Sequence, residues 1–182
     1  GIKDCYPFEM NLEVRYFFDN ERKFCIDIII ENTGEETAPV AAGWHPYFTF
    51  GHTVDELELD LPFMRRILID DKMIPTGLKK PFQRFTSARD QELRLNSDCY
   101  DTCFRLDKPA SPASGFHSYI YSPVLDATLH LEQSENLSYL QLFTPGDRQS
   151  VALEPVSANI NSFQNGEGLC ILEPGQKETY RV

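Results

Sequence analysis

Apolar and polar residues alternate with a period of two along most of this chain, and that pattern limits its fold more than any other feature. Residues 12–18 carry Leu, Val, Tyr and Phe at every second position, and residues 24–30 carry Phe and Ile in the same way. Alternation at this period gives a β-strand two different faces. The polar residues 19–21 lie between the two segments, which are therefore predicted to pair as a β-hairpin.

Similar short apolar segments follow along the chain, separated by stretches rich in Pro, Gly and Ser. No sustained 3.6-residue apolar stripe, the mark of an amphipathic helix, interrupts them. The polar segment 78–98, which contains Pro81, is expected to be a loop with room for one helical turn. We therefore predict an all-β protein built as an antiparallel β-sandwich. Its strands are expected within 57–61, 67–69, 116–120, 127–131, 139–144, 151–154 and 169–182.

Length favours one folding unit. A chain of 182 residues can bury roughly 70% of the surface that it exposes when unfolded. The sequence has no internal repeat, no low-complexity tail and no linker-like segment. Residues 1–182 are therefore predicted to form a single domain.

Charge and cysteine content narrow the possible partners and the compartment. The formal net charge is −11 and no block of Lys and Arg occurs, which argues against nucleic acid and anionic membranes as partners. No apolar run approaches the roughly 20 residues of a membrane span, and residues 1–20 do not resemble a signal peptide. The five cysteines are odd in number and form no C-x-x-C pair, so a reducing, cytoplasmic setting is expected.

His45 is the first candidate for chemistry. It lies among aromatic residues in Gly43-Trp44-His45-Pro46-Tyr47-Phe48, where a strand-like run ends, and the following proline favours an extended backbone. An imidazole held in this way can act as a general acid. It can equally be an ordinary, partly buried histidine at the end of a strand.

Glu154 is the second candidate, at the end of the apolar run 151–153 and directly before Pro155. A carboxylate is rarely buried in an interior strand without a purpose, because loss of solvent raises its pKa. We read Glu154 as a base that faces the same pocket as His45. The alternative is a glutamate on a solvent-exposed face, since it shares a side with Ala152 under period two.

Two further polar residues are candidates for ligand binding. Asp101 lies between Tyr100 and Phe104, although it could instead cap a loop, as Asp98 could. Gln141 alternates with two leucines, so its amide points either into a pocket or to solvent.

Other kinds of site have little support. His52, His117 and His130 are expected to be surface residues, the four histidines lack the spacing of metal ligands, and Cys99 with Cys103 makes only a weak pair. There is no glycine-rich phosphate loop and no G-x-S-x-G nucleophile motif. These patterns predict no metal site and leave proton transfer on a polar, uncharged ligand.

Six motifs, in order, resemble those of the aldose 1-epimerase (galactose mutarotase) family. The resemblance covers nearly the whole chain, and it adds Tyr6-Pro7-Phe8 and the 12–30 hairpin, which look like the family's mid-chain strands. The motifs are Gly43-Trp44-His45-Pro46-Tyr47-Phe48, Ile74-Pro75-Thr76-Gly77, Asp101-Thr102-Cys103-Phe104, Leu140-Gln141-Leu142-Phe143-Thr144, Leu153-Glu154-Pro155 and Leu172-Glu173-Pro174-Gly175.

This resemblance implies a β-supersandwich and the interconversion of the α and β anomers of an aldose such as galactose or glucose, without a cofactor. It implies that Glu154 is the general base for the C1 hydroxyl and that His45 is the general acid for the ring oxygen. Asp101 and Gln141 would hydrogen-bond sugar hydroxyls.

The family has further strands before the Tyr-Pro-Phe segment, with an arginine and a second histidine for the sugar pocket. By this resemblance the chain is expected to be a supersandwich incomplete at its N-terminus. Missing strands would leave apolar faces and open edges, so we expect self-association.

Two other functions are compatible with the motifs. One is a carbohydrate-binding module on the same scaffold, which would grip sugar without turnover. The other is an epimerase of hexose 6-phosphates, for which Arg65, Arg66 and Arg148 are the only evident candidates to hold the phosphate.

Overall fold

The computed structural model describes residues 5–82, 92–107 and 115–182, and these residues form strands joined by turns and loops, with very little helix. Every strand pairing in this part of the chain is antiparallel. The strands are β1 (Met10–Phe18), β2 (Phe24–Asn32), β3 (Ala38–Val40), β4 (Tyr47–Phe48), β5 (Glu58–Asp60), β6 (Met64–Ile69), β7 (Pro75–Pro81), β8 (Glu92–Arg94), β9 (Asp101–Leu106), β10 (Phe116–Ser122), β11 (Ala127–Gln133), β12 (Tyr139–Phe143), β13 (Val151–Val156), β14 (Cys170–Leu172) and β15 (Lys177–Arg181).

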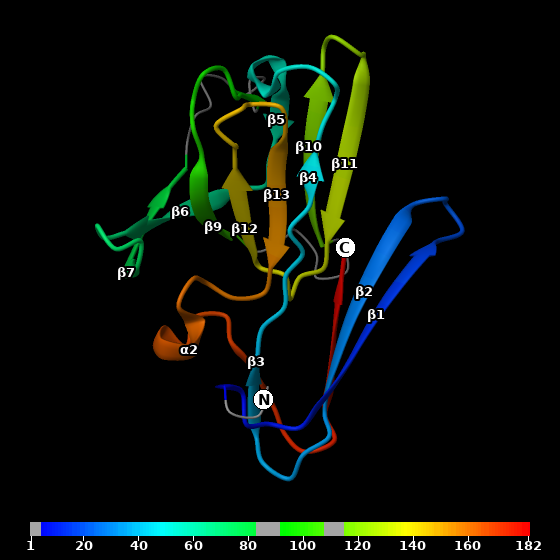
Figure 1. Ribbon diagram of the computed structural model, residues 1–182, viewed down its shortest axis with the longest axis vertical. Helices are drawn as coiled ribbons and strands as arrows, with labels where there is room; N and C mark the ends of the chain where they lie inside the picture. Colours follow the sequence, from blue (N-terminus) through cyan, green and yellow to red (C-terminus); the bar gives the residue numbers. More distant parts are fainter. Residues whose placement is uncertain (1–4, 83–91, 108–114) are drawn as a thin grey trace.

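Two sheets pack face to face to form the main body (Figure 1). One has the strand order β4-β13-β12-β9-β6-β7 and the other the order β11-β10-β5-β8. Alternate residues of both sheets point into the shared core, including Phe104, Leu140 and Leu153 from the first and Leu59 and Ile120 from the second. Burial of these apolar side chains drives the packing. The predicted all-β antiparallel sandwich is confirmed.

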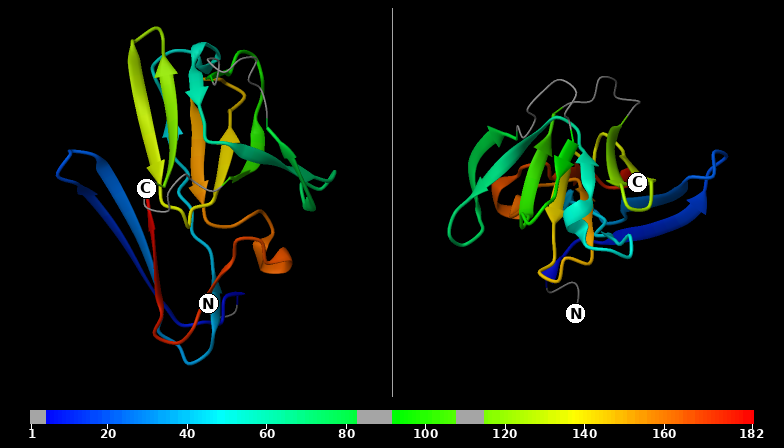
Figure 2. Two further views of the ribbon diagram at one scale, coloured as in Figure 1. Left: turned by 180° about the vertical axis from the view of Figure 1, so that it is seen from behind. Right: turned by 90° about the horizontal axis from the view of Figure 1, so that it is seen from above.

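A third sheet, β1-β2-β15, extends away from this body (Figures 1 and 2). Its β1–β2 hairpin is the one predicted from the alternation, with Met10 opposite Asn32 and Phe18 opposite Phe24. In the turn, Asp19 accepts hydrogen bonds from the backbone N–H groups of residues 21 and 23. β15 completes the sheet, and the C-terminal Val182 exchanges two backbone hydrogen bonds with Ile26 of β2.

The segment 78–98 is not only the loop that its polarity predicts. β7 runs on to Pro81 and β8 occupies Glu92–Arg94, while residues 83–91 lie outside the described part of the chain. Both strands lie at the edge of a sheet, where a polar segment needs only one neighbour. Pro75 and Pro81 at the ends of β7 fit such an edge. The loop prediction was wrong here because polarity marks edge strands as well as loops.

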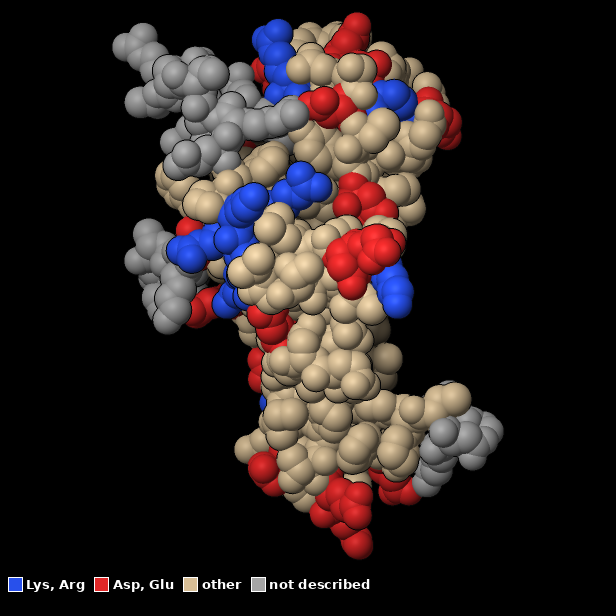
Figure 3. Space-filling view, turned by 90° about the vertical axis from the view of Figure 1, so that its left-hand side faces the viewer, with Lys and Arg blue, Asp and Glu red and all other residues tan. Residues whose placement is uncertain are grey.

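Helical structure is confined to short pieces in the described residues: the 3₁₀ turn η1 (Val54–Glu56) and α2 (Ser162–Asn165). No helix among these residues has the length and apolar character to cross a bilayer. On the side that carries β6, β7 and α2, basic side chains gather beside acidic ones (Figure 3). Arg65 on β6 is ion-paired with Asp107, and Lys79 on β7 is ion-paired with Glu167.

Candidate active site

Three neighbouring strands of the six-stranded sheet present one side chain each at the same level. Gln141 on β12 lies directly opposite Glu154 on β13 and opposite Cys103 on β9. Their neighbours Leu140, Leu142, Leu153 and Phe104 point to the other face, into the sandwich core. Period two thus places apolar residues inward and these three side chains outward, on one face of the sheet.

Asp101 lies at the start of β9, diagonal to Gln141, and the two side chains are joined. The Gln141 amide Nε2 donates a hydrogen bond of 2.7 Å to Asp101 Oδ1. Asp101 therefore belongs to a strand, which excludes the alternative of a loop cap. The carboxylate fixes the orientation of the amide, so the Gln141 carbonyl oxygen and the second Asp101 oxygen are free to meet a ligand.

His45 reaches the same face from the segment between β3 and β4. Gly43 makes an isolated bridge to Val156, and the Trp44 N–H donates to the Pro155 carbonyl at 3.0 Å, which ties this segment to β13. The imidazole stacks on the Tyr47 ring with centroids 4.8 Å apart. Its Nε2 lies 3.3 Å from Glu154 Oε1.

Glu154 is buried although it points away from the sandwich core, with a side chain only 11% exposed against 54% for His45. Burial raises the pKa of Glu154, the charge of Asp101 raises it further, and His45 acts in the opposite direction. The carboxyl group is thus poised to accept a proton more readily than a solvent-exposed glutamate. The alternative of a glutamate on a solvent-exposed face is wrong.

These four residues line one groove of about 460 Å³. Aromatic and apolar walls come from Tyr47, Phe143 and Ile160, and none of the described residues that line the groove is Lys or Arg. Cys103 lies on its floor, where burial raises the pKa of the thiol to about 12. The thiol therefore stays protonated near neutral pH and is not a nucleophile.

The three arginines considered for a phosphate lie elsewhere. Arg148 pairs with Asp55 and binds the carbonyls of residues 96 and 98, and Arg65 pairs with Asp107. Arg66 lines a different, smaller cavity beside Tyr100. The described part of the groove offers no cationic clamp for a phosphate group.

The structure thus brings together all four residues that the sequence singled out, His45, Glu154, Asp101 and Gln141. It also adds Asn159, which the sequence reasoning missed. Asn159 is 4% exposed, lines the groove from the loop after β13 and donates its amide to Glu167. A single asparagine in a polar loop carries no pattern that would have indicated its position.

The prediction for the other histidines needs correction. His52 is not a surface residue, because its ring contacts the Ser122 hydroxyl at 2.7 Å and the Thr53 carbonyl at 2.9 Å, and its side chain is only 15% exposed. His130 is exposed as predicted, whereas His117 is half-buried. Spacing along the chain also could not reveal that His117 and His130 lie side by side, 13 residues apart, on paired strands.

Comparison with solved structures finds the same fold. A galactose mutarotase-like protein from Clostridium acetobutylicum superposes with a TM-score of 0.82 at 16% identity, over 98% of this chain and 56% of its own. A homologue of GalM/aldose epimerase from C. elegans gives a TM-score of 0.78 at 15% identity, over 96% of this chain and 58% of its own. Both confirm the galactose mutarotase-like supersandwich.

Sequence comparison agrees with the fold. The chain is 27% identical over 177 residues to the uncharacterized protein YihR of Escherichia coli K12, covering 94% of this chain and 54% of YihR. It spans a little over half the length of each of these relatives. The family model for aldose 1-epimerase matches residues 1–182. The chain belongs to the aldose 1-epimerase family.

Proposed function

We propose that this chain carries the acid and base of a mutarotase, which interconverts the α and β anomers of an aldohexose such as galactose or glucose. The family match supports an isomerase of this class. The observation that carries the proposal is the pair formed by His45 Nε2 and Glu154 Oε1, 3.3 Å apart at the groove. The ring oxygen and the hydroxyl oxygen of a sugar hemiacetal are bonded to the same carbon, so an acid and a base this close can reach both.

The reaction needs two proton transfers and no redox step. Glu154 takes the proton of the C1 hydroxyl while His45 gives a proton to the ring oxygen. The bond from C1 to the ring oxygen breaks and C1 becomes an aldehyde carbon. After rotation about the C1–C2 bond, the ring oxygen attacks the other face and both transfers reverse. General acid–base catalysis by a positioned side chain contributes roughly 10²–10⁴-fold to such a step.

The rest of the groove suits a neutral sugar. Asp101 and Gln141 form a hydrogen-bonded pair that is fixed before a ligand arrives, and they offer acceptors to sugar hydroxyls. Tyr47 and Phe143 supply ring faces against which the apolar side of a sugar can pack. The groove's lack of Lys and Arg among its described residues favours a free hexose over a hexose phosphate.

Polarimetry on freshly dissolved α-D-glucose and α-D-galactose tests the proposal. The chain is expected to speed the approach to anomeric equilibrium over buffer alone. Glu154→Gln keeps the shape of the side chain but removes the base, so the rate should fall roughly 10²–10⁴-fold. Glu135→Gln, the same change at an exposed glutamate outside the groove, should leave the rate unchanged.

Sugar affinity separates an enzyme from a binding module. In a mutarotase, Glu154→Gln should spare most of the affinity for galactose while it removes turnover. Sugar binding without any acceleration by the unmodified chain would instead favour the carbohydrate-binding module. Competition by galactose 6-phosphate at concentrations well below those needed for galactose would favour the sugar-phosphate enzyme.

A further inference from the structure

A second group of chemically active side chains lies on the other sheet, on the β10–β11 hairpin. His117 is directly opposite Glu132, and Tyr119 is directly opposite His130. Antiparallel pairing therefore puts all four side chains on one face of the hairpin, whereas Ile120 and Leu131 belong to the sandwich core. The groove of the candidate active site is built on the six-stranded sheet and includes none of these residues.

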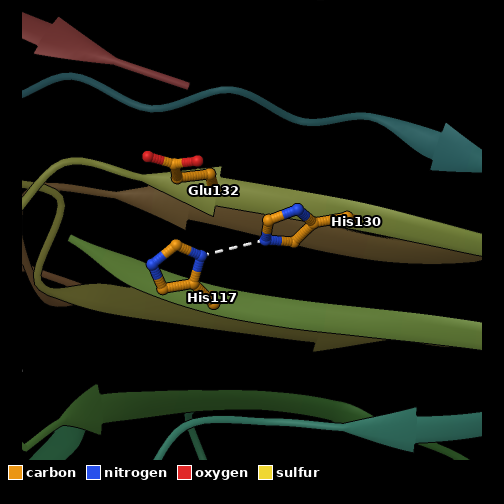
Figure 4. A group of neighbouring side chains, drawn as sticks. All are labelled: His117, His130 and Glu132. Atoms are coloured by element: carbon orange, nitrogen blue, oxygen red, sulfur yellow. Dashed lines mark hydrogen bonds between the residues drawn. The ribbon is translucent and has the colours of Figure 1, made fainter. Parts of the chain in front are cut away.

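The two imidazole rings face each other, and Glu132 lies beside them (Figure 4). His117 Nδ1 and His130 Nε2 are 2.9 Å apart, and one ligand atom from each of the three residues lies within 4.8 Å of the others. Ligands of one tetrahedral Zn²⁺ ion each lie about 2.0–2.2 Å from the metal, so neighbouring ligand atoms are roughly 3.3–3.6 Å apart. The two imidazole nitrogens, 2.9 Å apart, would separate slightly to reach that distance, and Glu132 would rotate toward them to supply the third ligand.

Ring contacts hold the histidines near this geometry. The His130 ring stacks on Tyr119, with centroids 4.4 Å apart and planes at 10°. The His117 and His130 rings lie at 20° with centroids 5.1 Å apart. Since both rings are restrained by the strands and by stacking, a metal ion would find two of its ligands already positioned, which lowers the entropy cost of binding.

Two of the contacts that a metal would replace are weak. The hydrogen bond between the two imidazoles contains one proton. A change of tautomer moves this proton to the other nitrogen of the donor ring, which faces outward. Glu132 is paired only loosely with Lys23, at 3.4 Å, and both side chains are nearly half exposed. Exposed ion pairs of this kind contribute only about 0–1 kcal/mol, so displacement of Lys23 costs little.

We propose that His117, His130 and Glu132 form a binding site for a divalent transition-metal ion such as Zn²⁺. Two imidazoles and one carboxylate suit Zn²⁺ and its neighbours in the first transition row better than Ca²⁺ or Mg²⁺, which prefer oxygen ligands alone. Three protein ligands leave at least one coordination position open. His130 and Glu132 also line a groove of about 590 Å³ between β11 and the β2 and β15 strands, so that position is reached from solvent.

Calorimetric titration of the 182-residue chain with ZnCl₂ tests the site. We expect one ion per chain, and we expect His117→Gln, His130→Gln and Glu132→Gln each to weaken binding by at least about tenfold, as loss of even an outer-shell partner does. His45→Gln removes a histidine beside another carboxylate, and Glu135→Gln removes a glutamate from the same groove. Both controls should bind Zn²⁺ as the unmodified chain does.

Nuclear magnetic resonance of the imidazole nitrogens is a second test of Zn²⁺ binding, and it uses the unmodified chain. Zn²⁺ should shift the signals of His117 and His130 and leave those of His45 and His52 in place. Absence of binding, equal loss of affinity in the control variants, or shifts confined to His45 and His52 would each overturn the proposal. The titration follows metal and not sugar, so its outcome is independent of the mutarotase proposal.

Discussion

Glu154 combines two properties that work against each other, a buried position and a role that requires a charge. Its carboxyl group lies on the face of β13 that points away from the sandwich core, yet the groove walls and His45 remove most of its solvent. The resulting rise in its pKa suits a proton acceptor and at the same time disfavours the charged form in the folded state.

Stability should therefore depend on this one residue in a definite direction. The folded-state pKa of Glu154 lies above its ordinary value of 4.5, so the folded chain keeps a proton that the unfolded chain has released. The free energy of unfolding then decreases as pH rises through the window between the two pKa values. At pH 7 the ionised carboxylate is a net cost to folding.

Glu154→Gln removes that cost, and its free energy of unfolding at pH 7 should equal or exceed that of the unmodified chain by up to about 1 kcal/mol. Well below pH 4.5 the difference should vanish, because the carboxyl group is then protonated in both the folded and the unfolded state. Urea unfolding at both pH values measures this. A variant clearly less stable at pH 7 would show that the charge is well paired in the folded state.

The neighbouring Asp101 offers a test of the pH dependence of activity. Its negative charge raises the pKa of Glu154, so Asp101→Asn should lower that pKa. The acid limb of the kcat/KM profile should then move to lower pH, while KM for the sugar increases through loss of an acceptor. Asp98→Asn makes the same change three residues away, beside a different cavity, and should leave the acid limb in place.

At the scale of elements, the segment that carries His45 passes very close to β13 at Gly43. A Cβ atom on Gly43 would lie 2.6 Å from the Val156 Cγ1 atom, closer than side chains tolerate. Because Gly43 bridges to Val156 and lies two residues before His45, any shift at this point moves the imidazole relative to Glu154.

Gly43→Ala should lower kcat about tenfold to a hundredfold, since displacement of a catalytic group by about 1 Å has effects of that size. Val156→Ala opens the space that the new methyl group needs, so the double variant should recover part of the lost rate. Recovery will be partial, because the Pro155 carbonyl would still lie 3.3 Å from the added Cβ. Steady-state polarimetry of the three variants decides this, and a double variant no faster than Gly43→Ala would place the effect elsewhere.

Sequence reasoning identified where the strands lie along the chain better than it identified which strands pair with one another. Alternation reports that a strand has two different faces, and so it indicated the β1–β2 hairpin, β10–β13 and the outward position of Gln141. It carries no information on which distant strands pair. The approach of Gly43 to Val156, the proximity of His117 to His130 and the edge position of β8 all depend on such pairing.

The burial of Glu154 also could not be predicted from local alternation. Its shared face with Ala152 suggested exposure under period two, but walls from the β3–β4 segment and the loop after β13 bury it. Burial of a polar residue in a groove depends on segments that are distant in sequence. The family motifs supplied the link between His45 and Glu154 that local pattern alone could not.

At the scale of the whole molecule, the sheet that extends from the sandwich exposes apolar surface. Leu12, Tyr16 and Phe18 on β1 are 63%, 65% and 72% exposed, and β1 pairs with only one strand in the described part of the chain. Large exposed apolar patches and open edges favour association.

We therefore expect a second copy of the chain to cover this surface, with a concentration-dependent shift from monomer to dimer in sedimentation velocity. Tyr16→Lys should weaken this association by at least about tenfold, because it puts a charge into the patch. Phe63→Lys alters an equally exposed aromatic residue on another part of the molecule and should have no effect. A compact monomer at all concentrations would contradict the prediction.

The alignment of all four candidate residues along one sheet has a consequence for how such a protein can change over time. Glu154, Gln141 and Asp101 are locked together by strand register, and a slip of one residue on any of these strands would turn its side chain into the core. His45 lies between the Gly43–Val156 bridge and the β4–β13 pairs, which follow one register along β13. An insertion between Gly43 and β4 would therefore displace the imidazole, whereas a substitution at position 45 leaves the register unchanged, so we expect length to be kept in this segment while the residue at position 45 can be exchanged.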